Sequence, residues 1–333
     1  MTSELRPGPL NLITDVPGLA VGHVTDEAVR SGATVLRTDG FWAAAVDVRG
    51  GGPGTRETEA LAPENLVGKA HAIALAGGSV FGLAVADGVV ATLSAQGQGL
   101  QLKPGSPAIP VVPAAVLHDL GNGGDKHWGL EPPYRRWGIE AVAAAAREFA
   151  LGRVGAGRGA MAGHLPGGVG SASLDLGDGL IVGALVAANP IGSVYMPDGQ
   201  SFWAWPFEID GEFGGHRPQG HGPVADPMPG ASRLAGLGRM QAGTSTTLAV
   251  VACNADLTTA ECKRLAMMAQ DGIARAVRPA HTPFDGDTVF ALASGAVALG
   301  DARAVQLGRL GSAAADCLAR AIARAVYEAS RSP

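Results

Sequence analysis

Short apolar runs bounded by glycine or proline recur along the whole chain, and several of them are apolar on both faces. They cover residues 33–36, 42–48, 72–75, 109–117, 180–188, 246–252 and 288–293. Runs of this length without polar alternation are typical of strands in a sheet that is covered on both sides. Pro110 and Pro113 interrupt the fourth run, which makes it the least regular strand. Helical patterns lie between the runs, so the alternation predicts a layered α/β protein.

Four segments carry helical patterns. The clearest begins at Thr258-Thr259-Ala260-Glu261, which matches a capping box and is followed by apolar residues at helical spacing. The others are a helix capped by Ser79, an alanine-rich helix over residues 138–150, and a last helix from about Ser312. Cys262 and Cys317 fall on apolar helix faces, and we expect them to be small core residues.

Charge and hydropathy exclude several classes of partner. The net charge is −5, and the 333 residues contain no basic run of the kind that marks a nucleic-acid surface. The longest apolar stretches fall far short of the roughly 20 residues that span a bilayer. The chain has no secretory leader pattern, and its three cysteines, an odd number without a C-x-x-C pair, favour a reducing compartment. We therefore expect a cytoplasmic protein without nucleic-acid or membrane partners.

The glycine-rich segments do not complete a cofactor motif. Residues 50–56 resemble a phosphate-binding loop but lack the Gly-Lys-Ser/Thr that should follow. Residues 155–160 resemble a dinucleotide-binding turn but lack the spacing of strand, helix and later acid. The histidines show no metal-ligand spacing. These segments and the histidines thus predict neither a cofactor nor a metal.

A long connection over residues 211–243 ends at a run of hydroxyl side chains. The connection holds nine glycines and four prolines, and we expect it to be mobile. Thr244-Ser245-Thr246-Thr247 follows it at the mouth of an apolar strand. Threonine suits strands, so this run fits an ordinary strand start. It also fits self-cleavage, in which a hydroxyl attacks the preceding peptide and frees an α-amine of pKa about 7.7–8.0 that then acts as its base.

Two further polar motifs stand at strand ends. Asp285-Gly286-Asp287 precedes the run at residue 288 and fits three interpretations: a solvated turn, a divalent-cation site, or a pair that orients a catalytic amine. Asn189 follows the run 180–188 and fits either a turn or an amide donor to an oxyanion.

Together these motifs resemble the DmpA peptidase family, which includes L-aminopeptidase D-Ala-esterase/amidases, β-peptidyl aminopeptidases and the NylC-type nylon-oligomer hydrolases. The resemblance covers nearly the whole chain. It is carried in order by Ile13-Thr14-Asp15-Val16-Pro17-Gly18, residues 46–51, Pro53-Gly54-Thr55-Arg56-Glu57-Thr58, Gly77-Gly78-Ser79-Val80-Phe81-Gly82-Leu83, Asn189-Pro190, residues 246–251, His281-Thr282 and residues 284–291.

The resemblance implies a single self-processing domain with a four-layer αββα sandwich, DmpA/ArgJ-like. The family nucleophile falls on Thr246, so the bond between Ser245 and Thr246 is the implied cleavage site. The products would be a larger fragment, residues 1–245, and a smaller one, residues 246–333. Asn189 matches the oxyanion-hole asparagine, and Asp285 and Asp287 match the pair that orients the amine and hydroxyl of the nucleophile.

The resemblance also bears on four further positions, and at two of them, His164 and Ser245, this sequence departs from the family pattern. Tyr134 lies where the family has an active-site tyrosine, and Glu131 is a candidate for holding a substrate ammonium. His164 stands where the nylon-oligomer hydrolase has a lysine, which would be charged at pH 7 whereas histidine is mostly neutral. Ser245 stands where the family often has Asn or Gly.

The implied activity is that of an N-terminal-nucleophile amidase or aminopeptidase. Its substrates would be short peptides or amide oligomers, with nylon-type 6-aminohexanoate oligomers among the candidates. The family also implies a homo-oligomer of processed heterodimers. Two alternatives remain open: an acyltransferase of the ornithine-acetyltransferase type, in which an amine intercepts the acyl-enzyme, and a non-catalytic scaffold on the same fold.

Overall fold

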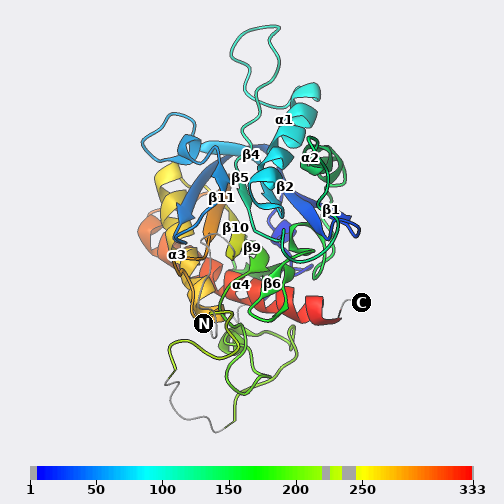
Figure 1. The fold of residues 1–333 in the computed structure, drawn as a ribbon. Helices are drawn as coiled ribbons and strands as arrows, with labels where there is room; N and C mark the ends of the chain where they lie inside the picture. Colours follow the sequence, from blue (N-terminus) through cyan, green and yellow to red (C-terminus); the bar gives the residue numbers. More distant parts are fainter. Residues whose placement is uncertain (1–5, 220–225, 235–244, 332–333) are drawn as a thin grey trace.

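The computed structural model describes residues 6–219, 226–234 and 245–331, which form one nine-stranded sheet, a small two-stranded sheet and four α-helices (Figure 1). The helices are α1 Val85–Ala95, α2 Tyr134–Ala143, α3 Thr259–Ala276 and α4 Arg303–Arg331. The strands are β1 Leu19–Asp26, β2 Ser31–Val48, β3 Thr55–Arg56, β4 Lys69–Ala76, β5 Ala114–Val116, β6 Met161–Ala162, β7 Leu165–Pro166, β8 Gly168–Asp175, β9 Ile181–Asn189, β10 Thr246–Ala255 and β11 Thr288–Val297. Short 3-10 turns cover Ile13–Asp15, Glu59–Leu61, Ser79–Ala84, Gly155–Gly157 and Trp205–Phe207.

The long strand β2 joins the two halves of the large sheet. The strand order is β3-β5-β4-β2-β11-β10-β9-β8, and β1 also pairs with β2. Residues 31–38 of β2 pair with β1, residues 33–37 and 42–43 pair with β4, and residues 43–48 pair with β11. The predicted runs 33–36 and 42–48 are therefore one strand. Pairing of β10 with β11 is parallel and pairing of β10 with β9 is antiparallel.

Along the long strands, alternate side chains point into different apolar clusters. The structure therefore has four layers: a helix layer, two sheet layers and a second helix layer. Leu248 and Val250 of β10 lie in an inner cluster that also holds Leu36 of β2 and Leu75 of β4, so this cluster joins the two halves of the sheet. A second cluster packs α1 and α2 against β2 and β4, and a third packs α3 and α4 against β8 to β11. In Figure 1 the pair α1 and α2 lies apart from the pair α3 and α4. The expected αββα sandwich is confirmed.

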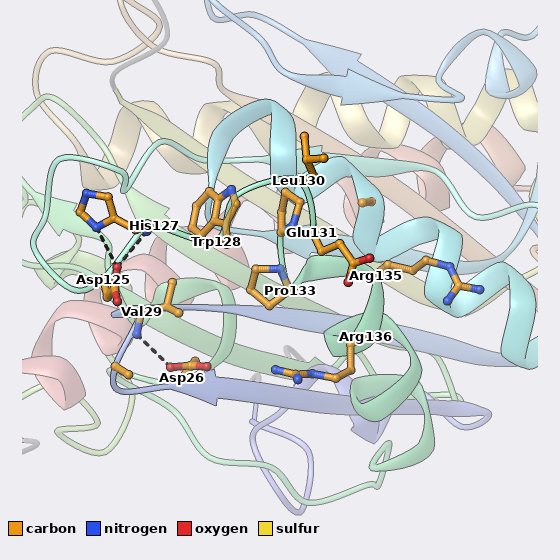
Figure 2. Close-up of a pocket in the computed structure, with 13 residues that line it drawn as sticks. Asp26, Val29, Asp125, His127, Trp128, Leu130, Glu131, Pro133, Arg135 and Arg136 are labelled. Carbon is orange, nitrogen blue, oxygen red and sulfur yellow. Dashed lines mark hydrogen bonds and ion pairs between the residues drawn. The ribbon is translucent and has the colours of Figure 1, made fainter.

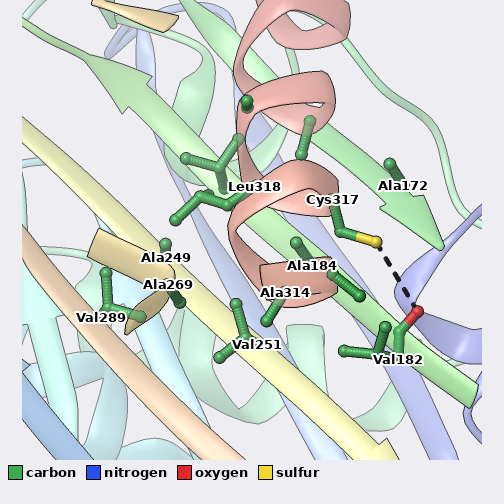
Figure 3. Packing of buried hydrophobic residues seen from close by; sticks show 14 of the residues in the cluster. Ala172, Val182, Ala184, Ala249, Val251, Ala269, Val289, Ala314, Cys317 and Leu318 are labelled. Carbon is green, nitrogen blue, oxygen red and sulfur yellow. Dashed lines mark hydrogen bonds between the residues drawn. The ribbon is translucent and has the colours of Figure 1, made fainter. Parts of the chain in front are cut away.

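Small side chains let α3 and α4 lie close to the sheet. Figure 3 shows Ala269 of α3 and Ala314 of α4 against Ala249 and Val251 of β10. Cys253, Cys262 and Cys317 are free and buried, as expected of core residues. Burial raises the pKa of the Cys253 and Cys317 thiols to about 12, so neither is a reactive thiolate.

The helix that begins after Thr258 has the predicted capping box, but the other helix bounds differ from expectation. The hydroxyl of Thr258 accepts from Glu261 N, and the Glu261 carboxylate accepts from Thr258 N. Ser79 caps nothing, because its backbone is left-handed (φ +52°) and begins a 3-10 turn. The helix expected over 138–150 begins earlier and ends at Ala143, since Ala146 pairs with Val21 and draws the chain to the edge of β1.

The irregular strand and the last helix also differ. The run 109–117 forms only the three-residue β5, because Pro110 and Pro113 lack the N–H groups that a longer ladder needs. Helix α4 begins at Arg303 rather than near Ser312.

The described parts of the connection over residues 211–243 are anchored, contrary to the expectation of a wholly mobile segment. Phe213 is buried in the α3/α4 core, Glu212 pairs with Arg320 of α4, and Ser232 is fully buried. Residues 220–225 and 235–243 of that prediction lie outside the described residues. Across the described ranges, no helix combines the length and hydropathy needed to cross a bilayer.

Candidate active site

The sheet register brings three of the predicted motifs to one end of the molecule. Asn189 is the last residue of β9, Thr246 is the first of β10, and the two are partners in the antiparallel ladder. Strand β11 begins at Thr288, directly after the Asp-Gly-Asp turn, and lies parallel to β10. A residue pairing between Ser245 and Asp285 extends this contact. Strand order therefore assembles the site from segments that are distant in the sequence.

The hydroxyl of Thr246 lies on the peptide bond that precedes it. Its Oγ1 donates a hydrogen bond to the carbonyl oxygen of Ser245 at 2.5 Å, and the N–H of Gly286 donates to the same oxygen at 2.8 Å. Both residues of this peptide are buried. The Oγ1 of Thr247 is also buried but has no hydrogen-bond partner among the described residues. The geometry thus distinguishes Thr246 from the adjacent hydroxyl residue.

Gly286 has no room for a side chain. A Cβ at this position would lie 2.7 Å from Thr246 Oγ1 and 2.9 Å from the carbonyl oxygen of Gly52. The glycine-rich segment at Gly50 is equally tight, since its Cβ would lie 2.3 Å from the carbonyl oxygen of Asp285. This segment therefore supports the Asp-Gly-Asp turn and brings Gly286 N–H to the carbonyl of Ser245.

Asp287 fixes the start of β10. Its Oδ1 accepts the N–H of Thr247 at 2.8 Å. Its Oδ2 accepts the N–H of His281 at 3.1 Å and faces Nδ1 of the same histidine at 2.9 Å. The carboxylate thus holds the backbone one residue beyond Thr246.

Asp285 holds the turn and the strand end opposite it. Its Oδ2 accepts from the N–H and the hydroxyl of Thr282 at 2.9 and 2.6 Å, and its Oδ1 accepts the N–H of Ile191 at 3.3 Å. Burial, followed by the negative charge of Asp287, raises the pKa of the Asp285 carboxyl to about 6. Both aspartates are only 1% exposed, so the solvated-turn interpretation is wrong. Within the described residues no group of three or more His, Cys, Asp or Glu forms a metal site.

Asn189, the ladder partner of Thr246, has an amide whose hydrogen-bonding capacity is not fully used. The residue is fully buried, and its Oδ1 accepts the N–H of Met161 at 2.8 Å. Its Nδ2 makes a long contact of 3.4 Å to the carbonyl oxygen of His118. The first bond fixes the side chain, while the long second contact leaves donor capacity for another acceptor.

Tyr134 lies in a second polar cluster, which also contains Ser31, Gly78 and Asp119. Its buried hydroxyl is 3.3 Å from Ser31 Oγ. Asp119, next to His118, accepts the N–H of Gly78 at 2.7 Å, while its other oxygen is buried without a partner in the described structure. Burial raises the pKa of both Tyr134 and Asp119. This cluster adjoins Asn189 through His118.

Glu131 and His164 lie on the surface rather than against Thr246. Glu131 is exposed and lines a pocket together with Trp128, Arg135 and Arg136 (Figure 2). His164 is exposed in the turn between β6 and β7. That turn does approach the site, because Gly163 N–H donates to Pro190 O at 3.1 Å.

Three residues at the site escaped prediction. Gly286 and His281 lie within the family-like motifs. A single sequence does not show that the Gly286 N–H contacts Ser245 or that His281 contacts the Asp287 carboxylate. Arg233 lies in the glycine- and proline-rich connection, where no periodic pattern marks it. Its guanidinium nevertheless reaches Ser245 Oγ at 2.9 Å.

Two solved structures with the same architecture are named as aminopeptidases. A β-aminopeptidase from Burkholderia sp. superposes with a TM-score of 0.71 at 26% identity, covering 98% of this chain and 88% of that one. The L-aminopeptidase D-Ala-esterase/amidase of Ochrobactrum anthropi, described as a variant of the Ntn hydrolase fold, gives a TM-score of 0.67 at 20% identity over 96% and 86% of the two chains. The fold is thus that of the Ntn-type aminopeptidases.

The chain belongs to peptidase family S58, whose model matches residues 11–332. An uncharacterized aminopeptidase of Mycobacterium tuberculosis is 42% identical, with 96% of this chain and 94% of the relative covered. A 6-aminohexanoate-oligomer endohydrolase of Kocuria sp. is 29% identical over 89% of this chain and 78% of the relative. The protein is a hydrolase of peptide or amide bonds, with the aminopeptidase or amidase activity expected from its motifs. This sets aside the alternative of a non-catalytic scaffold.

Proposed function

We propose that the chain cleaves its own Ser245–Thr246 bond and then hydrolyses amides with the freed Thr246 as nucleophile. One observation carries this proposal. The Thr246 hydroxyl and the Gly286 N–H both contact the carbonyl oxygen of Ser245, at 2.5 and 2.8 Å. The attacking group and a donor for the developing negative charge are therefore already on the bond that is to break.

Self-cleavage proceeds by an acyl shift followed by hydrolysis. Thr246 Oγ1 bonds to the carbonyl carbon of Ser245, and Gly286 N–H stabilises the negative charge on the carbonyl oxygen. The C–N bond then breaks, with the hydroxyl proton ending on the nitrogen of Thr246, which leaves an ester between the two residues. Water adds to this ester and releases a carboxylate at Ser245 and a free hydroxyl at Thr246. The freed α-amine has a pKa near 7.7–8.0, so at neutral pH it is mostly protonated and a fraction of it is neutral.

In the mature enzyme the same threonine attacks a substrate amide. Its neutral α-amine accepts the hydroxyl proton as Oγ1 bonds to the substrate carbonyl carbon. The Asn189 amide stabilises the oxyanion, the amine returns the proton to the leaving nitrogen, and water hydrolyses the acyl-enzyme. Asp287 supports this geometry by fixing Thr247 N–H, and Asp285 does so by fixing Ile191 beside the Asn189 strand end.

The substrate class is proposed from the relatives. The names of the Burkholderia and Kocuria proteins point to β-amino acid peptides and 6-aminohexanoate oligomers, both of which are joined by amide bonds. We propose short peptides or amide oligomers as substrates for this chain. Tyr134 stays a prediction for a catalytic residue, and Glu131 and His164 stay predictions for substrate contacts. A cytoplasmic homo-oligomer of processed heterodimers stays the expected assembly.

The direct test is intact-mass analysis of freshly purified protein, followed by N-terminal sequencing of the smaller fragment. The wild-type chain should give fragments that end at Ser245 and begin at Thr246. The Thr246→Ala variant should remain a single 333-residue chain without amidase activity. The neighbouring Thr247→Val variant is the control and should still be cut. A Thr246→Ala variant that is cleaved and active refutes the proposal.

The acyltransferase alternative is separated by adding a free amine to the assay. A hydrolase gives mainly the free acid as product, whereas a transferase gives mainly the new amide. Dipeptides, β-dipeptides and 6-aminohexanoate oligomers should be compared at equal concentrations.

A further inference from the structure

The segment that carries Arg233 is fastened to the strand end beside the nucleophile. Ser232 N–H donates to the carbonyl oxygen of Pro229 at 2.8 Å, and Ser232 Oγ donates to the carbonyl oxygen of Ile191 at 3.1 Å. Arg233 N–H donates to that same Ile191 oxygen at 2.9 Å. These bonds place the Arg233 side chain over the residues that follow β9.

The guanidinium of Arg233 converges on the bond proposed for cleavage. Its Nη2 lies within hydrogen-bond distance of Ser245 Oγ at 2.9 Å and of the carbonyl oxygens of Pro190, Asn189 and Met161 at 3.0, 3.2 and 3.3 Å. All four groups are acceptors, and together they hold the guanidinium against both Ser245 and the strand end opposite Thr246.

This arrangement is costly as a stabilising device. The Nε of Arg233 is buried without a hydrogen-bond partner among the described residues, and burial lowers the pKa of the guanidinium, although the charge of Asp285 opposes this. A buried cation that is only partly satisfied contributes little to stability, because desolvation offsets its contacts. Its position is therefore better explained by what it does to Ser245.

We propose that Arg233 is a positioning residue for self-cleavage, acting through the hydroxyl of Ser245. This inference rests on the self-cleavage proposed above. Gly286 N–H holds the Ser245 carbonyl on one side, and Arg233 holds the Ser245 side chain on the other. The peptide is thereby fixed with its carbonyl against Thr246 Oγ1. The hydroxyl of Ser245 supplies the acceptor that Arg233 uses.

The expected effect is on the rate of cleavage. Misplacing a reacting group by about 1 Å costs roughly 10²-fold in rate, so losing one of two restraints should slow cleavage by about 10- to 100-fold. Arg233→Lys should retain part of the rate, because an ammonium reaches one or two acceptors but lacks the planar fork.

The experiment follows cleavage of the full-length chain during timed cell-free synthesis, for wild type, Arg233→Gln, Ser245→Ala and the double variant. Arg217→Gln is the matched control, because Arg217 belongs to the same connection but is exposed and lies over Trp205. The control should cleave like wild type. Each single variant should be slowed, and the double variant should be no slower than the slower single, because both remove the same contact.

Each other outcome overturns the inference in a recognisable way. Additive slowing in the double variant means that Arg233 acts independently of Ser245, as it would through a general folding defect. An Arg233→Gln chain that cleaves at the wild-type rate removes the positioning role and leaves self-cleavage intact. A wild-type chain that stays whole overturns the proposed function itself.

Discussion

Asn189 and Thr246 lie directly opposite each other in the antiparallel ladder of β9 and β10. After cleavage before Thr246, these two residues would belong to different fragments, as would Asn189 and the Asp285–Asp287 turn. The hydrogen bonds of the sheet, rather than the continuity of the chain, would then hold the amide donor against the nucleophile.

The Asn189→Ala variant should lose turnover but keep the fold. We expect kcat to fall by about 10²–10³, the usual cost of removing one oxyanion donor. Asn254→Ala is the matched control. Asn254 is likewise a buried asparagine, bonded to Ile181 N and Gly179 O, but it belongs to β10 and lies near the end of that strand far from Thr246. Its loss should lower the melting temperature without changing kcat. Steady-state kinetics and thermal unfolding of both variants decide whether Asn189 acts in catalysis or only in folding.

The Gly286→Ala variant should abolish self-cleavage. The new methyl group would lie 2.7 Å from Thr246 Oγ1, so either the hydroxyl or the turn must move away from the Ser245 carbonyl. We expect cleavage to slow by at least about 10²-fold, because both the attacking group and a donor are displaced. Gly121→Ala adds the same methyl group in open space and should cleave normally. Intact mass after timed synthesis measures both, and normal cleavage of Gly286→Ala would contradict the proposed geometry.

Asp285 should make stability depend on pH in the uncut chain. Its pKa is raised to about 6, above the ordinary value near 3.9, so the folded state binds its proton more tightly than the unfolded state does. Its contribution to the free energy of unfolding therefore falls as pH rises from about 4 through about 6. In a Thr246→Ala background, Asp285→Asn should gain about 1 kcal/mol relative to its parent between pH 5 and pH 7.5.

Thermal unfolding at the two pH values measures this difference. Asp301→Asn removes an exposed carboxylate and is the control for the loss of one negative charge. The relative melting temperature of Asp285→Asn should rise with pH, whereas that of Asp301→Asn should stay level. A relative melting temperature for Asp285→Asn that falls with rising pH would mean that the carboxylate is stabilised when ionised.

The sequence patterns predicted those features of the fold that depend on residues close together in the chain. The capping box at Thr258 forms between residues three apart. The two-sided apolar strands and the apolar helix faces of Cys262 and Cys317 are visible in the spacing of neighbouring residues. Two predicted strands proved to be one, because nothing in residues 37–41 shows that β2 continues through them. The helix expected over 138–150 failed for a similar reason, since its end is set by pairing of Ala146 with the distant Val21.

The sequence predicted the candidate site residues that lie in recognisable motifs, but not those that only the fold brings to the site. Thr246, Asn189 and the two aspartates lie in distinctive segments, and the sheet register brings them together. The roles of Gly286 and Arg233 depend on contacts with Ser245 that a single sequence does not encode. Glu131 lies only three residues before Tyr134, but the turn of the chain before α2 leaves Glu131 on the surface while Tyr134 is buried.

A buried ion pair should hold the two fragments together after cleavage. Arg320 of α4 contacts Glu212 through Nε at 2.5 Å and Nη2 at 3.0 Å, and the two side chains are only 1% and 8% exposed. Asn11 Nδ2 donates to the same carboxylate at 2.7 Å. Arg320 would belong to the smaller fragment, and Glu212 and Asn11 to the larger one.

Removing one partner of such a pair leaves the other charge buried, which typically costs about 3–5 kcal/mol. We therefore expect Glu212→Ala to lower the melting temperature markedly and to promote dissociation of the fragments in dilute urea. Glu140→Ala is the control, because it breaks an exposed pair with Arg136 that is worth at most about 1 kcal/mol. Thermal unfolding and size-exclusion chromatography of the processed protein measure both effects. If Glu212→Ala unfolds at the same temperature as Glu140→Ala, the pair does not hold the fragments together, and the sheet ladders and the apolar clusters that the two fragments share must do so.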